Sequence, residues 1–296
     1  MLICDTHADT LYSRARGKKH FDITLEHMLS SNDTRVQAMA LFVTPQKMAE
    51  TPSILQRELD ELEKAKKEGW RQIAHLEDAL PGQANLLLTI EGGEAFGEDE
   101  DNVERMANIG VRMAALTWNY ENLIAQPAER GEDHGLTDFG RRVVRRMQKH
   151  HMAADISHLN QSAVWDLLEM GVIPMASHSC VRALCDHYRN LTDDQLRALF
   201  QAGGFVGVNF YSAFLSPDGK ASLDTVVDHI AYICDLGGEN CVGFGSDFDG
   251  IDLWPEGLRN AGDIPALLDC MRRRGFGETL VENIAGLNFK RYLSLI

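Results

Sequence analysis

The sequence predicts an α/β protein built as a (β/α)₈ TIM barrel, and three observations support this prediction. Eight short apolar runs alternate with longer segments of helical period along the 296 residues. Eight is also the number of parallel strands that closes such a barrel. Histidine or carboxylate side chains stand where five of these runs end, and the ends of all barrel strands converge on one face. An open parallel sheet covered by helices is the alternative that this pattern leaves.

The predicted strands are short apolar runs, and many of them end in a polar cluster. They cover residues 2–5, 36–43, 86–90, 111–117, 152–156, 172–176, 205–210 and 242–245. Runs of this kind, apolar on both faces, are typical of parallel strands that helices cover.

The predicted helices carry apolar residues three and four positions apart, which is the period of a helix face. The clearest of them cover residues 55–70, 139–150, 162–170, 193–202 and 223–236. Thr137 and Thr192 stand where N-caps are expected, and Gly203 and Gly237 stand where helices should end. Because the chain shows no linker, repeat or shift in composition, we expect residues 1–296 to form a single domain.

The charge balance excludes two classes of partner. With 29 basic and 44 acidic residues, the chain has a formal net charge of −15, which repels nucleic acid and anionic membrane surfaces. The first five residues turn polar too early for a signal peptide, and no apolar run approaches the roughly 20 residues that span a bilayer. We therefore expect a cytoplasmic protein. Its six scattered cysteines lack CxxC spacing and are expected to be free thiols, and the oligomeric state stays open, a homodimer included.

Side chains that can bind metal stand directly after predicted strands. They are His7 and Asp9 after the first strand, Glu91 after the third, His158 after the fifth, His178 after the sixth, and Asp247 with Asp249 after the eighth. Any one histidine alone is more often a core or surface residue than a ligand, but five strand ends agree here. Nitrogen and oxygen ligands without thiolates suit zinc, with manganese, cobalt or iron as other occupants. His7 and Asp9 can grip one ion together because residues i and i+2 of an extended chain point the same way.

The motifs around these residues resemble those of the membrane dipeptidase (renal dipeptidase) family, peptidase family M19. The resemblance rests on Asp-Thr-His-Ala-Asp-Thr at 5–10, Ile-Glu-Gly-Gly at 90–93, Asp-Ile-Ser-His at 155–158 and Ala-Ser-His-Ser at 176–179. Further matches, in the family's order, are Gly-Leu-Thr-Asp-Phe-Gly at 135–140, Tyr-Arg-Asn at 188–190, Gly-Val-Asn-Phe-Tyr at 207–211 and Gly-Phe-Gly-Ser-Asp-Phe-Asp-Gly at 243–250. Together they cover nearly the whole chain and form a specific set.

The resemblance implies a barrel of the metal-dependent hydrolase type and a zinc-dependent dipeptidase. It assigns His7 and Asp9 to one zinc ion, His158 and His178 to a second, and Glu91 to both as a bridge. In this family the two ions activate a bridging water that attacks the peptide bond. The small dipeptide substrates implied include those with a C-terminal D-residue.

Four further residues gain roles from the same resemblance. Asp247 matches the proton shuttle between the attacking water and the departing amine. Arg189 matches the residue that pairs with the substrate's C-terminal carboxylate, and Tyr211 is placed with it in the substrate pocket. Trp118 departs from the mammalian pattern, which has histidine there. Either the indole N–H of Trp118 supplies a replacement hydrogen-bond donor, or that contact is dispensable and the rate or specificity differs. The structural alternative is that Trp118 is a core or pocket-wall residue.

Three other functions stay open at the level of sequence. A metal-dependent barrel hydrolase could act on another small amide, such as a lactam or an N-acyl amino acid. A metal-dependent sugar isomerase also uses histidine and carboxylate at barrel strand ends, but it has no use for a carboxylate-binding Arg189. A barrel that only binds metal or peptide is disfavoured because the ligand set and the Asp247 match are complete.

Overall fold

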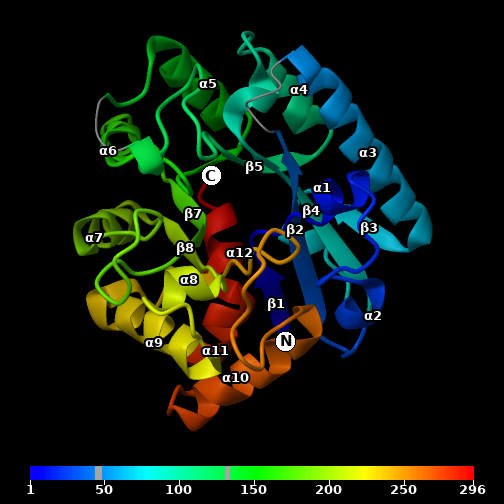
Figure 1. Cartoon of the computed structure of the whole chain (residues 1–296), viewed down its shortest axis with the longest axis vertical. Helices are drawn as coiled ribbons and strands as arrows, with labels where there is room; N and C mark the ends of the chain where they lie inside the picture. The colour runs from blue at the N-terminus through cyan, green and yellow to red at the C-terminus, as the bar shows by residue number, and fades with distance from the viewer. Residues whose placement is uncertain (44–48, 131–133) are drawn as a thin grey trace.

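A closed ring of eight parallel strands forms the centre of the computed structural model, which describes residues 1–43, 49–130 and 134–296 (Figure 1). The strands of the ring follow in the order β1 (Leu2–Asp5), β2 (Thr34–Phe42), β4 (Ala84–Glu91), β5 (Val111–Ala115), β6 (Ala153–Asp155), β7 (Met175–Ser179), β8 (Phe205–Val208) and β9 (Val242–Phe244). Pairing of β9 with β1 and of β2 with β4 closes the ring. The predicted TIM barrel is therefore confirmed, and the open sheet is excluded.

Each of the eight predicted strands forms, but one is displaced along the chain. The apolar pattern predicts a strand over residues 172–176, whereas β7 covers Met175–Ser179. Val172 instead completes the end of the preceding helix, where its N–H bonds to the Leu167 carbonyl and Gly171 takes a left-handed φ of 72°. The strand begins only after Pro174, which cannot donate to a sheet ladder. As a result, His178 lies within its strand rather than after it.

A ninth strand, β3 (Trp70–Ile73), is absent from the sequence prediction. The helical pattern over residues 55–70 includes Trp70, but the helix ends at Glu68 because Gly69 adopts a φ of +123°. Trp70 then begins β3, which pairs with the first half of β4 outside the ring. The second half of β4 pairs with β5 instead.

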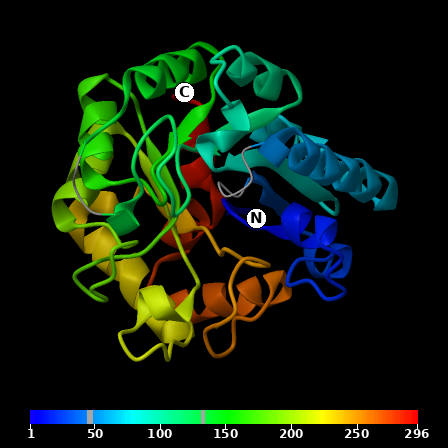
Figure 2. The same ribbon diagram turned by 45° about the horizontal axis from the view of Figure 1, so that its top comes forward.

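Helices surround the strands in both views (Figure 1; Figure 2). They are α1 (Thr10–Ala15), α2 (Leu25–Met28), α3 (Thr51–Glu68), α4 (Asn102–Asn108), α5 (Asp138–Lys149), α6 (Gln161–Glu169), α7 (Asp193–Ala202), α8 (Ser212–Leu215), α9 (Leu223–Ile233), α10 (Ile264–Arg273), α11 (Glu278–Glu282) and α12 (Asn288–Leu293). Thr137 and Thr192 are N-caps as predicted. Gly203 ends α7 at a φ of 80°, and Gly237 has a φ of 92° in the π-helical turn after α9. Among the described helices, none is long and apolar enough to cross a membrane.

The two ends of the barrel differ in what fills them. At the N-terminal ends of the strands, Phe289 and Tyr292 of α12 pack against Phe205 with ring centroids 5.2 and 6.1 Å apart. The Tyr292 hydroxyl also donates to the Ile173 carbonyl at 3.0 Å. Core residues therefore close the barrel at the N-terminal ends of its strands. Polar side chains can then occupy the end formed by the C-terminal ends of the strands.

Candidate active site

The predicted metal-binding side chains meet at the C-terminal ends of the strands. His7 follows β1 by two residues, Glu91 is the last residue of β4, and His178 lies in β7. His158 and Asp247 each stand three residues beyond their strands, β6 and β9. The structure thus brings together residues up to 240 positions apart, as the convergence of barrel strand ends requires.

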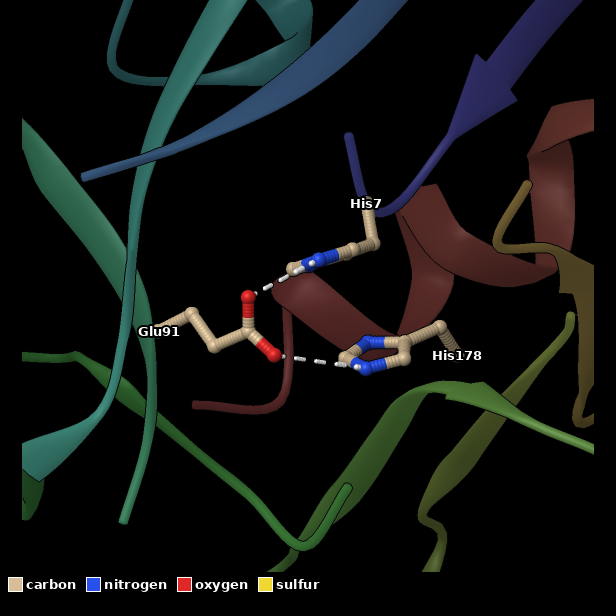
Figure 3. Close-up of side chains that lie close together, drawn as sticks. All are labelled: His7, Glu91 and His178. Carbon is tan, nitrogen blue, oxygen red and sulfur yellow. Dashed lines mark ion pairs between the residues drawn. The ribbon is translucent and has the colours of Figure 1, made fainter. Parts of the chain in front are cut away.

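The Glu91 carboxylate lies between two groups of imidazole nitrogens. Its Oε2 atom is 3.4 Å from His7 Nε2, while its Oε1 atom is 3.0 Å from His158 Nε2 and 3.7 Å from His178 Nε2. Figure 3 shows His7 and His178 on the two different oxygens. Because the two oxygens face separate sets of nitrogens, this carboxylate can contact two cations at once.

Two further carboxylates face His7. The His7 Nε2 atom is 4.0 Å from Asp9 Oδ1 and 3.8 Å from Asp247 Oδ1. Ligand atoms of His7, Asp9 and Asp247 lie within 4.8 Å of one another, as do those of His7, Glu91 and His178. His7 Nε2 and Asp9 Oδ1 are also buried without a hydrogen-bond partner. Since buried polar atoms normally have partners, these orphaned atoms fit a site built for metal ions.

The electrostatics around His7 are those of a crowded acidic site. Burial disfavours the charged His7 ring, but neighbouring carboxylates, Glu91 foremost, outweigh burial and raise the pKa of His7 to about 10. Burial raises the pKa of Asp247 to about 6 and also raises that of Asp9. Several carboxylates therefore crowd around His7, and cations placed among them would relieve their repulsion and displace the proton from the His7 ring.

His158 and His178 are in the opposite situation. Burial lowers the pKa of His158 to about 4 and also lowers that of His178, and the nearby Arg189 guanidinium adds to both shifts. Both rings are therefore neutral near pH 7. Neutral imidazole is the form that binds metal.

Hydrogen bonds on the far side of each ring orient these two histidines. His158 Nδ1 lies 2.6 Å from Asn119 Oδ1, and His178 Nδ1 lies 2.7 Å from Ser177 Oγ. Asn119 Oδ1 accepts a hydrogen bond from the His158 Nδ1–H group, which leaves Nε2 of that ring unprotonated toward Glu91. The sequence patterns give no role to Asn119 or Ser177, although each is adjacent in sequence to a residue that they do single out.

A cavity of about 480 Å³ opens over these residues, a volume within the range of small-molecule sites. Its walls include Phe42, Trp118, Tyr211 and Phe214, together with the site carboxylates. The Trp118 ring lies 5.1 Å from the Phe42 ring and 6.3 Å from the His158 ring, measured between centroids. The structure thus places Trp118 at the pocket, a position that fits both a pocket-wall residue and a hydrogen-bond donor to a bound molecule.

Arg189 approaches the site from the loop after β7. Its side chain is buried, its Nη2 atom donates to the His178 carbonyl at 3.2 Å, and its guanidinium stands 5.5 Å from the Phe214 ring centroid. Its Nε atom is buried without a hydrogen-bond partner. Arg189 lines a separate cavity of about 370 Å³, together with Tyr188. The guanidinium is thus close to the candidate metal-binding side chains, and its Nε–H group has no hydrogen-bond partner.

Two residues of the loop after β9, and one of the loop after β6, have unusual backbone conformations. Asp247 and Asp249 have φ values of 64° and 67°, and His158 has a φ of 69°. Such left-handed conformations are uncommon outside glycine and concentrate at functional sites. A Cβ atom at Gly250 would lie 2.2 Å from Asp9 Oδ2 and 2.8 Å from Asp247 Oδ1, so only glycine lets these carboxylates approach.

The Asp249 side chain bonds to other groups than the candidate metal-binding side chains. Its carboxylate accepts from the Thr10 hydroxyl at 2.6 Å and from the Asp22 N–H at 2.7 Å. These bonds tie the loop after β9 to α1 and to the segment that follows α1. Asp249 therefore fixes the loop that carries Asp247.

Comparisons with known proteins agree with the motifs. The profile of the family described as membrane dipeptidase (peptidase family M19) matches residues 1–296. The structure of dipeptidase AC, a metallopeptidase of family M19, is 25% identical, with a TM-score of 0.89 over 99% of this chain and 98% of that one. A metallopeptidase of Rhodobacter sphaeroides, solved with a phosphinate mimic of the dipeptide L-Ala-D-Ala, is 24% identical, with a TM-score of 0.88 over 99% of both chains.

A relative at the sequence level carries a similar description. An uncharacterized dipeptidase of Schizosaccharomyces pombe is 36% identical over 219 residues, which cover 72% of this chain. The matched stretch spans 54% of the yeast protein, so this chain corresponds to about half of that protein's length.

Proposed function

The chain belongs to the membrane dipeptidase family, peptidase family M19, and from this premise we propose that it is a zinc-dependent enzyme that hydrolyses small dipeptides through a two-metal site. Dipeptides with a C-terminal D-residue are among the proposed substrates, in keeping with the L-Ala-D-Ala mimic bound to the Rhodobacter sphaeroides protein. The observation that carries the proposal is the Glu91 carboxylate, whose two oxygens face His7 on one side and His158 with His178 on the other.

The donor set fits a pair of divalent ions. His7 and Asp9 would hold one ion, His158 and His178 the other, and Glu91 both. When bound, a metal pair supplies an acidified water and a polarised carbonyl. Nitrogen and carboxylate donors without a thiolate are consistent with zinc.

Asp247 would move a proton in the proposed reaction. Its Oδ2 atom accepts from Asn209 Nδ2 at 2.9 Å, while its Oδ1 atom faces the ligand cluster. Asn209 thus orients the carboxylate and leaves Oδ1 available. In the proposed reaction, Oδ1 accepts a proton as the water oxygen bonds to the carbonyl carbon, and it returns that proton to the amine nitrogen as the C–N bond breaks.

Three residues near the proposed metal ligands would bind the substrate's carboxylate and side chains. Arg189 carries a buried cation with a free donor, which suits a terminal carboxylate. Tyr211 and Trp118 line the cavity over the metal-binding residues, so we assign both to substrate contact. A panel of L-L dipeptides, L-D dipeptides, N-acyl amino acids and lactams tests the reaction class. Turnover of N-acyl amino acids or lactams without turnover of dipeptides would contradict the proposal.

Metal analysis gives the first test. Because the five proposed ligands come from four strand ends, and His7 Nε2 and Asp9 Oδ1 are buried without a hydrogen-bond partner, we expect close to two divalent ions per purified chain. Chelators should remove both the metal and the activity, and added zinc should restore both. Elemental analysis of the same sample used for the assay checks this. Full activity in a sample without metal would overturn the two-metal site.

Replacing Arg189 by methionine tests recognition of the substrate carboxylate. The change removes the cation and keeps most of the apolar stem that packs on Phe214. A charge-assisted hydrogen bond is worth about 1.5 to 3 kcal/mol, so kcat/KM for a free dipeptide should fall by roughly 10- to 150-fold.

The C-terminal amide of the same dipeptide is the control, because it lacks the carboxylate. It should be a poor substrate for the parent enzyme and nearly unaffected by the change. An equal loss on both substrates would show that Arg189 acts on structure or on a common step.

A further inference from the structure

We propose that Ser177 and Asp155 are positioning residues, which together fix the His178 ring so that its Nε2 lone pair is directed into the metal site. The inference rests on the proposed function, because it takes His178 as a metal ligand. It concerns residues to which neither the sequence motifs nor the comparisons give a role.

The hydrogen bonds around Ser177 Oγ can run in only one direction. Asp155 Oδ2 lies 2.5 Å from Ser177 Oγ, and a carboxylate can only accept. The hydroxyl proton of Ser177 is therefore directed to Asp155. Toward His178 Nδ1, 2.7 Å away, Ser177 Oγ can only accept, so Nδ1 of His178 carries the proton. The other nitrogen, Nε2, is then unprotonated.

The unprotonated Nε2 atom of His178 faces the other proposed metal ligands. It lies 3.7 Å from Glu91 Oε1 and 3.0 Å from His158 Nε2. In His158 the amide oxygen of Asn119 accepts directly from Nδ1. The two rings therefore present unprotonated nitrogens to the same carboxylate oxygen, and three acceptors at these distances need a cation between them. The tautomer is set by a direct acceptor in His158 and by the serine and aspartate in His178.

Ser177 itself has little freedom to move. It is 1% exposed, its N–H bonds to Asp155 Oδ1 at 2.9 Å, and its carbonyl accepts from the Thr6 hydroxyl at 2.6 Å. Cβ atoms placed at Gly207 and Gly245 would lie 2.2 and 1.8 Å from the Ser177 carbonyl oxygen. The neighbouring strands thus close tightly around Ser177, which suits a residue that must hold a ring at one angle.

The barrel contains a matched arrangement that lacks the histidine contact. Ser246 Oγ donates to Asp5 Oδ2 at 2.5 Å, and the Ser246 N–H bonds to Asp5 Oδ1 at 2.8 Å. Ser246 is as buried as Ser177, but the His7 atom that its hydroxyl approaches, at 3.3 Å, is the backbone carbonyl oxygen and not a ring nitrogen. Ser246→Ala therefore removes the same kind of bond without touching a ring that faces the metal site.

The test compares metal retention in the parent holoenzyme, Ser177→Ala and Ser246→Ala. Each protein is titrated with a zinc chelator, and the zinc left on the chain is measured by native mass spectrometry. Loss of a group that orients a metal-binding histidine lowers metal affinity by about 10- to 100-fold. We expect Ser177→Ala to release one of its two ions at a correspondingly lower chelator concentration, and Ser246→Ala to follow the parent. Equal release from the two variants, or none beyond the parent in Ser177→Ala, would overturn the proposal.

A second measurement needs no variant. The ring ¹⁵N spectrum of the parent holoenzyme reports which nitrogen of His178 is protonated, and the stacked His7 ring, 3.8 Å away between centroids, allows assignment through space. We expect a protonated Nδ1 and a metal-shifted Nε2. A protonated Nε2 would refute the positioning role. A parent that binds no metal would instead refute the proposed function itself, so the two failures are distinguishable.

Discussion

Replacing Glu91 by glutamine should remove most of the bound metal and lower kcat/KM by about 10³-fold or more. Glu91 is the carboxylate that both groups of nitrogens share, so a neutral amide removes charge from both proposed ion positions at once. A metal ion contributes several kcal/mol of transition-state stabilisation, and each 1.36 kcal/mol is a factor of ten in rate. Zinc content and steady-state kinetics on the same preparation measure the effect.

Glu94→Gln provides the matched control for this change. Glu94 is three residues further along and equally buried, at 2% exposure, but it does not belong to the candidate metal groups found among the described residues. Burial raises its pKa to about 7, so a neutral amide replaces a group that is already partly protonated at that pH. We expect Glu94→Gln to keep its metal and most of its activity. If Glu91→Gln behaves like this control, Glu91 does not bridge two ions.

The barrel and the composition of the site follow from patterns that the sequence retains. Apolar runs alternate with amphipathic segments because parallel strands are covered on the outside by helices and packed on the inside. Polar residues directly after those runs must then converge, which is why the sequence alone predicts that His7, Glu91 and Asp247 share one pocket. Local signals such as the Thr192 cap and the Gly203 stop also hold, because they depend only on neighbouring residues.

Two kinds of feature could not be predicted from the sequence. Boundaries set by a single backbone conformation are misplaced, as at Gly69, where the helical pattern continues past the residue that ends the helix. Contacts that depend on strand register are also hidden. His158 and Asn119 are 39 positions apart, and Ser177 and Asp155 are 22 apart. Side chains that orient a ligand carry no periodicity, so only the folded arrangement identifies them.

The second large effect is expected for Asp247→Asn, which should lower kcat by roughly 10² to 10⁴ while both metal ions stay bound. Metal content must be measured alongside kcat, because Asp247 Oδ1 is close enough to His7 and Asp9 to act as a metal ligand as well as a general base. An amide oxygen can still accept from Asn209 Nδ2, as Oδ2 does now, and asparagine tolerates the left-handed backbone at this position. The geometry of the loop should therefore survive, and the lost function is the ability to take up a proton.

Asp249→Asn is the control from the same loop and the same backbone region, with a φ of 67°. Its carboxylate is occupied by Thr10 and the Asp22 N–H, so this change should lower the unfolding temperature without a comparable fall in kcat. Zinc content separates the two roles of Asp247: a variant that keeps two ions and turns over slowly has lost its proton shuttle. A variant that loses an ion in proportion to its activity would make Asp247 a metal ligand, and the proton would then have to pass through another group.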